Sequence, residues 1–83
     1  MSAPLPKYEV MAEVFDHCIV FHTASNDAIM KVSGSFAYGK LFPMVDGNTY
    51  VLYVSPMYDM LEVAHYIAGD SVFDRRLRRR LTT

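Results

Sequence analysis

The chain has 83 residues, of which 52% are hydrophobic and 20% are charged. A chain of this length forms one small domain, and its apolar content is too high for a disordered protein. It contains no apolar run of the roughly 18–20 residues that cross a bilayer, and its start lacks the basic and apolar regions of a signal peptide. We therefore expect a single domain over residues 1–83 that lies in the cytoplasm, away from membranes. One cysteine, Cys18, agrees with a reducing compartment.

Charge divides the chain into an acidic body and a basic end. Residues 1–74 carry three basic and all nine acidic side chains, a net charge of −6, whereas residues 75–83 carry +5. The basic end contains Arg75, Arg76, Arg78, Arg79 and Arg80. Arginine binds phosphate and carboxylate groups through paired hydrogen bonds, so we expect this cluster to bind a nucleic acid or a protein. A solvated tail, or one docked on the acidic body of its own or a neighbouring subunit, is the alternative.

Two strands are predicted near the start, after a flexible arm at residues 1–6 that contains two prolines. Residues 8–15 alternate between apolar and polar side chains with the two-residue period of a half-buried strand. A helical stripe over the same residues is an alternative interpretation. Residues 16–23 are apolar on both faces in their middle, which indicates a central strand. A cluster of turn-forming residues follows at 23–27.

The next part of the chain is predicted to add two more strands. Residues 28–33 are interpreted as a third strand that ends at Gly34. Residues 36–45 alternate again, with Gly39 as a candidate β-bulge and Pro43 favouring a position at the edge of the sheet.

A hairpin is predicted at Asp46-Gly47, because a type I′ turn needs positive φ at both central residues and these two residue types tolerate it. The following strand, residues 49–54, is almost wholly β-branched or aromatic. Both of its faces are apolar, which favours a position inside the sheet. A two-residue loop would place Met44 opposite Thr49 and Phe42 opposite Val51.

One helix is predicted over residues 56–68. Ser55 has a side-chain oxygen that can cap the first turn, and Pro56 suits the first helical position. Gly69 suits the residue after the last turn. One apolar stripe is formed by Met57, Met60, Leu61, Ala64, Ile67 and Ala68. The sequence thus predicts an α+β fold, in which this helix covers an antiparallel sheet of four to five strands at residues 8–54.

The end of the chain, residues 71–83, is predicted to be a short basic helix or a tail. Ser71 and Asp74 resemble a capping box at the start of a helix over residues 72–81. Together with residues 61–71, this helix would have a loose helix-turn-helix geometry. We keep this geometry as a hypothesis for nucleic-acid binding.

Cys18, with His17 and His22 nearby in the sequence, is the best candidate for a catalytic nucleophile. In a strand, Cys18 and His22 share a face but are about 13 Å apart, too far for a hydrogen bond, and His17 points to the other face. A structural role for the thiol is therefore favoured. The spacing of the histidines, the cysteine and the carboxylates does not match a metal-binding motif, and we predict no cofactor, metal or catalytic residue.

Tyrosine and methionine are more abundant than a core of this size needs. Tyr58 and Tyr66 lie off the apolar stripe of the predicted helix, beside His65, so we predict that these three residues form part of an interface.

Taken together, these features favour a small non-enzymatic regulatory or inhibitory module that binds a larger protein or nucleoprotein, of the kind that viruses or mobile elements encode. A DNA- or RNA-binding regulator that uses residues 56–81 is the alternative, and an enzyme with Cys18 as nucleophile is the third hypothesis. A homodimer, formed through a strand edge or through the basic tail, is a further candidate.

Overall fold

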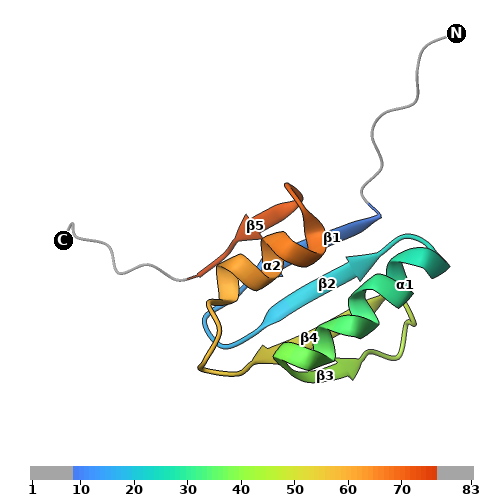
Figure 1. The fold of residues 1–83 in the computed structure, drawn as a ribbon. Helices are drawn as coiled ribbons and strands as arrows, with labels where there is room; N and C mark the ends of the chain where they lie inside the picture. Colours follow the sequence, from blue (N-terminus) through green and yellow to red (C-terminus); the bar gives the residue numbers. More distant parts are fainter. Residues whose placement is uncertain (1–8, 77–83) are drawn as a thin grey trace, which may run out of the picture.

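A computed structural model of the chain describes residues 9–76. It contains one mixed sheet with the strand order β3-β4-β2-β1-β5, and both α-helices lie on the same face of this sheet (Figure 1). The strands are β1 (Val10–Val14), β2 (Ile19–Thr23), β3 (Gly39–Pro43), β4 (Thr49–Val54) and β5 (Val72–Asp74). The helices are α1 (Asn26–Ser33), the 3-10 helix η1 (Gly34–Tyr38) and α2 (Met60–Ala68). The predicted α+β class is confirmed.

The core lies between the sheet and the two α-helices. Alternate residues of β1 and β2 are buried, as expected for strands with one covered face. Phe21 on β2 is the largest fully buried side chain and stands near the centre of the sheet. The helices contribute small and β-branched side chains to the same cluster: Ala28, Val32, Val63, Ala64, Ile67 and Ala68. Small helix residues let the helices pack close to the strands.

The predicted strands at 8–15 and 16–23 are confirmed as β1 and β2, with the expected faces, and β2 is central. The helical alternative for the first of them is therefore wrong over Val10–Val14. The sheet is not wholly antiparallel, however, because β5 pairs with β1 in parallel while the other three strand pairs are antiparallel.

The predicted hairpin has the expected register but not the expected turn. Phe42 pairs with Val51, and the Met44 N–H donates to the Thr49 carbonyl at 2.8 Å. Gly47 has φ of 78°, but Asp46 has no positive φ, so the turn is not type I′. Instead the Asp46 carboxylate accepts hydrogen bonds from the N–H groups two and three residues later. This local bonding replaces the tighter turn.

The strand predicted at residues 28–33 is wrong, because these residues belong to α1. The Ser25 hydroxyl accepts a hydrogen bond from the Ala28 N–H at 3.2 Å and so caps the helix. Ala28 and Val32, four residues apart, are fully buried on one helix face. Both β-like residue types and a helical spacing are present here, and the cap together with burial favours the helix. The edge position of the next strand, β3, is confirmed, but the strand begins only at Gly39.

The predicted start of the second helix is also wrong. The cap of α2 is Asp59, whose carboxylate accepts from the Glu62 N–H at 2.9 Å. Ser55 donates its own N–H to the Tyr38 carbonyl, which holds it in the loop after β4. The turn that follows is closed by the Tyr58 N–H and the Ser55 carbonyl. The predicted end at Gly69 is confirmed, with φ of 63°.

Residues 72–74 form strand β5 rather than the start of a basic helix. The Ala12 N–H donates to the Ser71 carbonyl, and the Arg75 N–H donates to the Val14 carbonyl, so both ends of β5 are fixed to β1. Backbone pairing with an open sheet edge outweighs a helix that would carry many like charges. The helix-turn-helix geometry is therefore wrong at these residues. The rest of the predicted basic helix and the arm at residues 1–6 lie outside the described residues.

Candidate functional site

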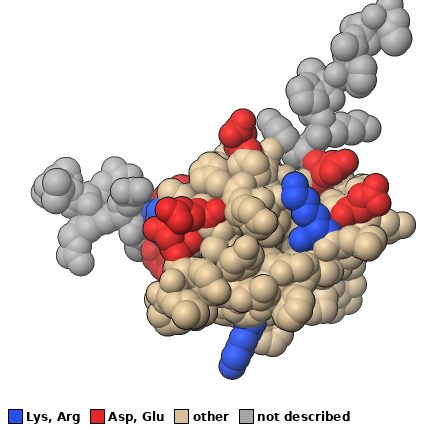
Figure 2. Space-filling model, in the orientation of Figure 1, with Lys and Arg blue, Asp and Glu red and all other residues tan. Residues whose placement is uncertain are grey.

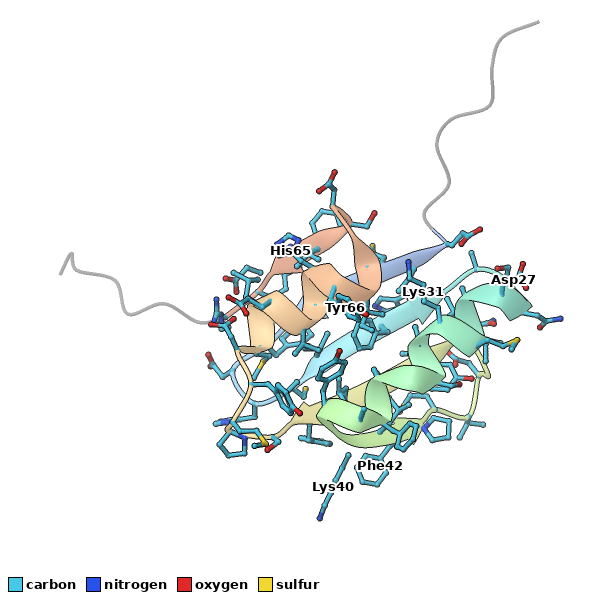
Figure 3. The ribbon with its side chains drawn as sticks, viewed as in Figure 1. Asp27, Lys31, Lys40, Phe42, His65 and Tyr66 are labelled. Atoms are coloured by element: carbon cyan, nitrogen blue, oxygen red, sulfur yellow. The ribbon has the colours of Figure 1, made fainter. Side chains whose placement is uncertain are left out.

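The face of the sheet opposite the helices is not covered by any element within residues 9–76 (Figure 1). Its outward-pointing side chains are half-buried or exposed, in contrast to the buried residues that alternate with them. Lys40 and Phe42 extend from the edge strand β3 away from the two helices (Figure 3). We call this surface the open sheet face; it consists of Met11, Glu13, Val20, His22, Lys40, Phe42, Thr49, Val51, Tyr53 and Phe73.

A row of side chains crosses all five strands of the open sheet face. The strand register aligns Phe73, Glu13, Val20, Val51 and Phe42 in this order from β5 to β3. Four of the five are apolar, and Phe42 is 50% exposed. Both faces of residues 49–54 are apolar in the sequence. Because helices cover one face only, the apolar side chains of the other face remain accessible.

A small group of charged residues interrupts this apolar surface. The Glu13 carboxylate lies 2.8 Å from His22 Nε2 and 3.2 Å from Arg75 Nε. The hydrogen bond with His22 is the main cause that lowers the pKa of Glu13, and Arg75 lowers it further. The Arg75 guanidinium also lies 5.5 Å from the centre of the Phe73 ring. The Glu13 carboxylate therefore holds the His22 and Arg75 side chains at the sheet surface.

The structure describes two of the five arginines that were predicted to bind phosphate or a partner, and both contact carboxylates. Arg75 bonds to Glu13, and Arg76 forms two side-chain hydrogen bonds with Asp74, at 2.9 and 2.6 Å. The contact with Asp74 raises the pKa of Arg76. Arg78, Arg79 and Arg80 lie outside the described residues.

His65 and Tyr66, two of the three predicted interface residues, lie on different sides of α2 (Figure 3). Tyr66 points from α2 toward α1, whereas His65 lies on the side of α2 nearer to β5 (Figure 3). His65 Nδ1 is 2.8 Å from the Gly69 carbonyl, where it can donate to the end of the helix. Tyr58 and Tyr66 instead meet at Tyr38, whose ring centre is 5.0 Å from that of Tyr58 and 6.1 Å from that of Tyr66.

Sequence reasoning missed Tyr38, because it placed this residue in a strand. Tyr38 ends η1, directly before β3, and its ring packs edge-on against the two predicted tyrosines. The available signal was the excess of tyrosines over what a core needs. The pairing itself depends on the end of η1 meeting the loop after β4 and helix α2 in space.

Cys18 is half-buried, and this burial raises the pKa of its thiol. A protonated thiol is a poor nucleophile. His22, which the sequence analysis considered as its base, bonds to Glu13. Within residues 9–76, histidine, cysteine and carboxylate side chains do not converge in a group of three or more that could hold a metal ion.

Comparison of the chain with protein-family models, with curated proteins and with solved structures found no match. None of the helices in the described part of the chain is long and apolar enough to cross a membrane. Two surfaces can support an inference about function. One is the open sheet face, and the other is the group of Tyr38, Tyr58 and Tyr66, which we call the tyrosine cluster.

Proposed function

We propose that the protein is a non-enzymatic binding module that engages a larger protein, or the protein part of a nucleoprotein, through the open sheet face. The apolar row that crosses all five strands is the observation that carries this proposal. Folded proteins rarely leave large apolar patches in contact with water unless another molecule covers them. A regulatory or inhibitory role fits such a module, because covering a partner's surface is its main means of action.

The composition of the open sheet face favours a protein as the occupant. Aromatic residues, methionine and arginine are enriched at protein interfaces. This face presents Phe42, Tyr53 and Phe73 with the partly buried Met11, and Arg75 lies beside it. The face is formed by a sheet, which fits the broad surface of a protein better than a small molecule, since small-molecule sites are concave. The Glu13, His22 and Arg75 group would supply polar contacts within an otherwise apolar interface.

The alternative function, a DNA- or RNA-binding regulator, loses the helix pair on which it was based, because β5 occupies residues 72–74. Arg75 and Arg76 are also occupied by carboxylates of the body. Binding of phosphate by these two side chains would first require these ion pairs to break. We therefore favour the protein partner and treat nucleic-acid binding as the competing outcome.

The test is photo-crosslinking from one position on each face of the molecule. A photoreactive phenylalanine analogue would replace Phe42 on the open sheet face or Met30 on α1, which is 75% exposed on the helix-bearing face. Irradiation in the cells that make the protein should give one discrete crosslinked species from position 42 and none from position 30. Mass spectrometry of that species identifies the partner.

A purified partner then allows the affinity to be measured. Phe42→Asp should weaken binding at least tenfold, because it places a charge in the apolar row. Met30→Asp is the matched control and should leave the affinity unchanged. Crosslinking from position 30 alone would show that the interface is not on the open sheet face. A crosslinked dimer of this chain would show that the partner is a second copy of the same chain.

The nucleic-acid alternative has its own test in the full chain. Fluorescence anisotropy with duplex DNA and single-stranded RNA would be measured over a salt series, for the natural chain and for R78A/R79A/R80A. Each phosphate contact that is lost should reduce the log–log salt slope on duplex DNA by about 0.9. Strong binding that depends on these arginines would overturn the preference for a protein partner.

A further inference from the structure

The tyrosine cluster lines a hollow on the helix-bearing face, on the opposite side of the sheet from the open sheet face. The hollow has a volume of about 240 Å³. Its lining residues are Tyr38, Tyr58, Asp59, Glu62, Val63 and Tyr66. Three aromatic rings and two carboxylates therefore surround one small space. A hollow of this size is below the range of pockets for drug-sized molecules, so it suits a single head group or side chain.

The three rings make edge-on contacts and are not stacked. The plane of the Tyr38 ring makes an angle of 86° with the ring of Tyr58 and 74° with the ring of Tyr66. Two rings thus stand nearly perpendicular to a third at the same hollow. The face of an aromatic ring carries partial negative charge, so any ring face that borders the hollow attracts a cation.

Backbone hydrogen bonds fix the segments that carry these rings. The Ser55 N–H donates to the Tyr38 carbonyl at 2.7 Å, and the Tyr58 N–H donates to the Ser55 carbonyl at 3.0 Å. These two bonds connect the end of η1 to the loop that carries Tyr58. Asp59 caps α2, from which Tyr66 projects. The rings are thus positioned by hydrogen-bonded backbone, which lowers the entropic cost of binding a ligand.

The residues that α2 contributes lie on one stripe of the helix. Glu62, Val63 and Tyr66 are spaced by three and four residues, so their side chains face the same side, and the cap residue Asp59 precedes Glu62 by three residues. Val63, which is almost fully buried, gives the hollow an apolar part of its wall. The stripe thus combines a negative charge, an apolar surface and an aromatic ring.

The charge of this region also favours a cation. Acidic side chains gather on the surface near the start of α2 (Figure 2). The hollow is lined by Asp59 and Glu62, and among residues 9–76 its lining includes no lysine or arginine. Lys31 lines a neighbouring hollow on the other side of Tyr38 and Tyr66, and it points into the space between the helices (Figure 3). The charge of the lining residues therefore favours a cation over an anion.

We propose that this hollow binds a methylated ammonium group, the head group shared by methylated lysine side chains and choline-type compounds. An unmethylated ammonium is compact and strongly hydrated, so it loses more hydration when it enters an aromatic site. Methylation leaves the positive charge and adds apolar surface, which matches the tyrosine rings and Val63. The site lies on the opposite side of the sheet from the proposed protein interface and does not depend on it.

The test is an NMR titration of the full, isotope-labelled chain with small cations. Tetramethylammonium and choline should cause saturable shifts at the backbone signals of Tyr38, Tyr58, Glu62 and Tyr66. The neutral carbon analogue of choline, 3,3-dimethylbutan-1-ol, should bind at least about tenfold more weakly, because it lacks the charge. Sodium and ammonium chloride at the same ionic strength should not saturate these signals.

Three variants and one control variant sharpen the result. Tyr66→Ala should weaken tetramethylammonium binding about tenfold, whereas Tyr66→Phe should retain it, because phenylalanine keeps the aromatic face. Glu62→Gln should weaken it severalfold and reduce its salt dependence. Tyr53→Ala, which removes a half-exposed tyrosine from the open sheet face, is the matched control and should have no effect. The amide spectrum of each variant verifies that it is folded.

The source of the head group is distinguished by a second pair of ligands. A peptide that contains trimethyllysine would bind more tightly than choline if the natural ligand is a protein side chain, and less tightly if it is a small molecule. Equal binding of the neutral analogue would show an apolar hollow without cation selectivity. Equal binding of ammonium would show attraction by the carboxylates alone. Either of these results, or the absence of saturable shifts, would overturn the proposal.

Discussion

The two faces of the sheet contain similar amounts of β-branched and aromatic residues but differ in how much of them is exposed to water. On the covered face, Phe21 and Leu52 are fully buried beneath the helices. On the other face, Val20 and Val51 occupy adjacent positions of the same two strands and are partly accessible to water. A strand side chain stabilises the fold only to the extent that folding removes it from water. The covered face should therefore determine stability, and the open sheet face should determine what the protein binds.

The largest expected effect comes from the centre of the covered face. Phe21→Ala should lower the free energy of unfolding by about 3–5 kcal/mol, because it removes a fully buried ring and leaves a cavity. The free energy of unfolding of a natural protein is only about 5–15 kcal/mol. The variant should therefore be largely unfolded at elevated temperature. Thermal and urea denaturation followed by circular dichroism measures the loss.

Phe42→Ala is the matched change on the open sheet face. It removes the same ring from a half-exposed site and breaks an edge-on contact with Tyr53 at a centre distance of 5.8 Å. The expected loss is about 1 kcal/mol. If both phenylalanine variants lost the same stability, the proposed division of roles between the faces would be wrong.

A second large effect is expected at the start of the edge strand β3. A Cβ atom at Gly39 would lie 2.0 Å from the Tyr53 carbonyl oxygen, so the neighbouring backbone would have to move. Gly39→Ala should cost about 1–3 kcal/mol and loosen the pairing of β3 with β4. Urea denaturation gives the cost, and hydrogen exchange of the β3 amides shows whether the loosening is local.

Gly34→Ala serves as the control for this substitution. Its Cβ would meet no atom within 4 Å, and its backbone is α-helical, so the change should be neutral or slightly stabilising. Comparable destabilisation by both variants would argue against the close strand contact at Gly39.

An intermediate effect is expected at the helix cap. Asp59→Ala should lower the free energy of unfolding by about 0.5–2 kcal/mol, because it removes the acceptor for the Glu62 N–H. Ser55→Ala should cost less than about 0.5 kcal/mol, because its hydroxyl lies 3.5 Å from the nearest backbone donor and does not cap α2. The reverse order in chemical denaturation would support the helix start that the sequence predicted.

The smallest effect concerns pH and the charged group on the open sheet face. The pKa of Glu13 is lowered from its ordinary value of 4.5 in the folded protein, mainly by the hydrogen bond with His22. The folded state therefore binds the proton less readily than the unfolded state, so this contribution is full above pH 4.5 and decreases as the pH falls through the lowered pKa. Since both partners of Glu13 are exposed by more than a third, the contribution should be below about 1 kcal/mol.

Glu13→Gln tests this pH dependence. The difference in urea midpoint between the natural chain and the variant should be largest near neutral pH and should decrease in acid. High salt should also reduce it, since the group lies at the surface. A difference that grows as the pH falls would contradict the assigned role of the carboxylate.

Local patterns identified several elements correctly, and specific residues show why. The alternation at residues 8–15 determined both β1 and its buried face, because one covered face requires a period of two. The register of the hairpin followed from the position of Asp46-Gly47 even though the turn type did not. Residues 28–33 were misassigned, because Ala, Ile and Val suit a buried strand and a buried helix face equally well.

The candidate sites were less predictable than the fold. Tyr58 and Tyr66 could be identified as tyrosines outside the core, but their shared neighbour Tyr38 depends on how η1 meets the loop after β4. The open sheet face depends on both helices packing against one side of the sheet, which no local pattern specifies. The arginines at 75 and 76 were identified by their charge. The carboxylate partner of Arg75, Glu13, is brought close by a strand pairing between distant segments, whereas the partner of Arg76, Asp74, lies only two residues away.

The sequence by itself therefore determined the α+β class, the strands β1 and β2, the pairing of β3 with β4 and the end of α2. These features depend on side-chain period and on glycine or proline at fixed positions, which act within a few residues. The tertiary structure alone decided that residues 72–74 join β1 as a strand, which face of the sheet is left open, and which tyrosines share a hollow. Each of these depends on contacts between segments far apart in the chain, whose free energy is gained only when the whole domain packs.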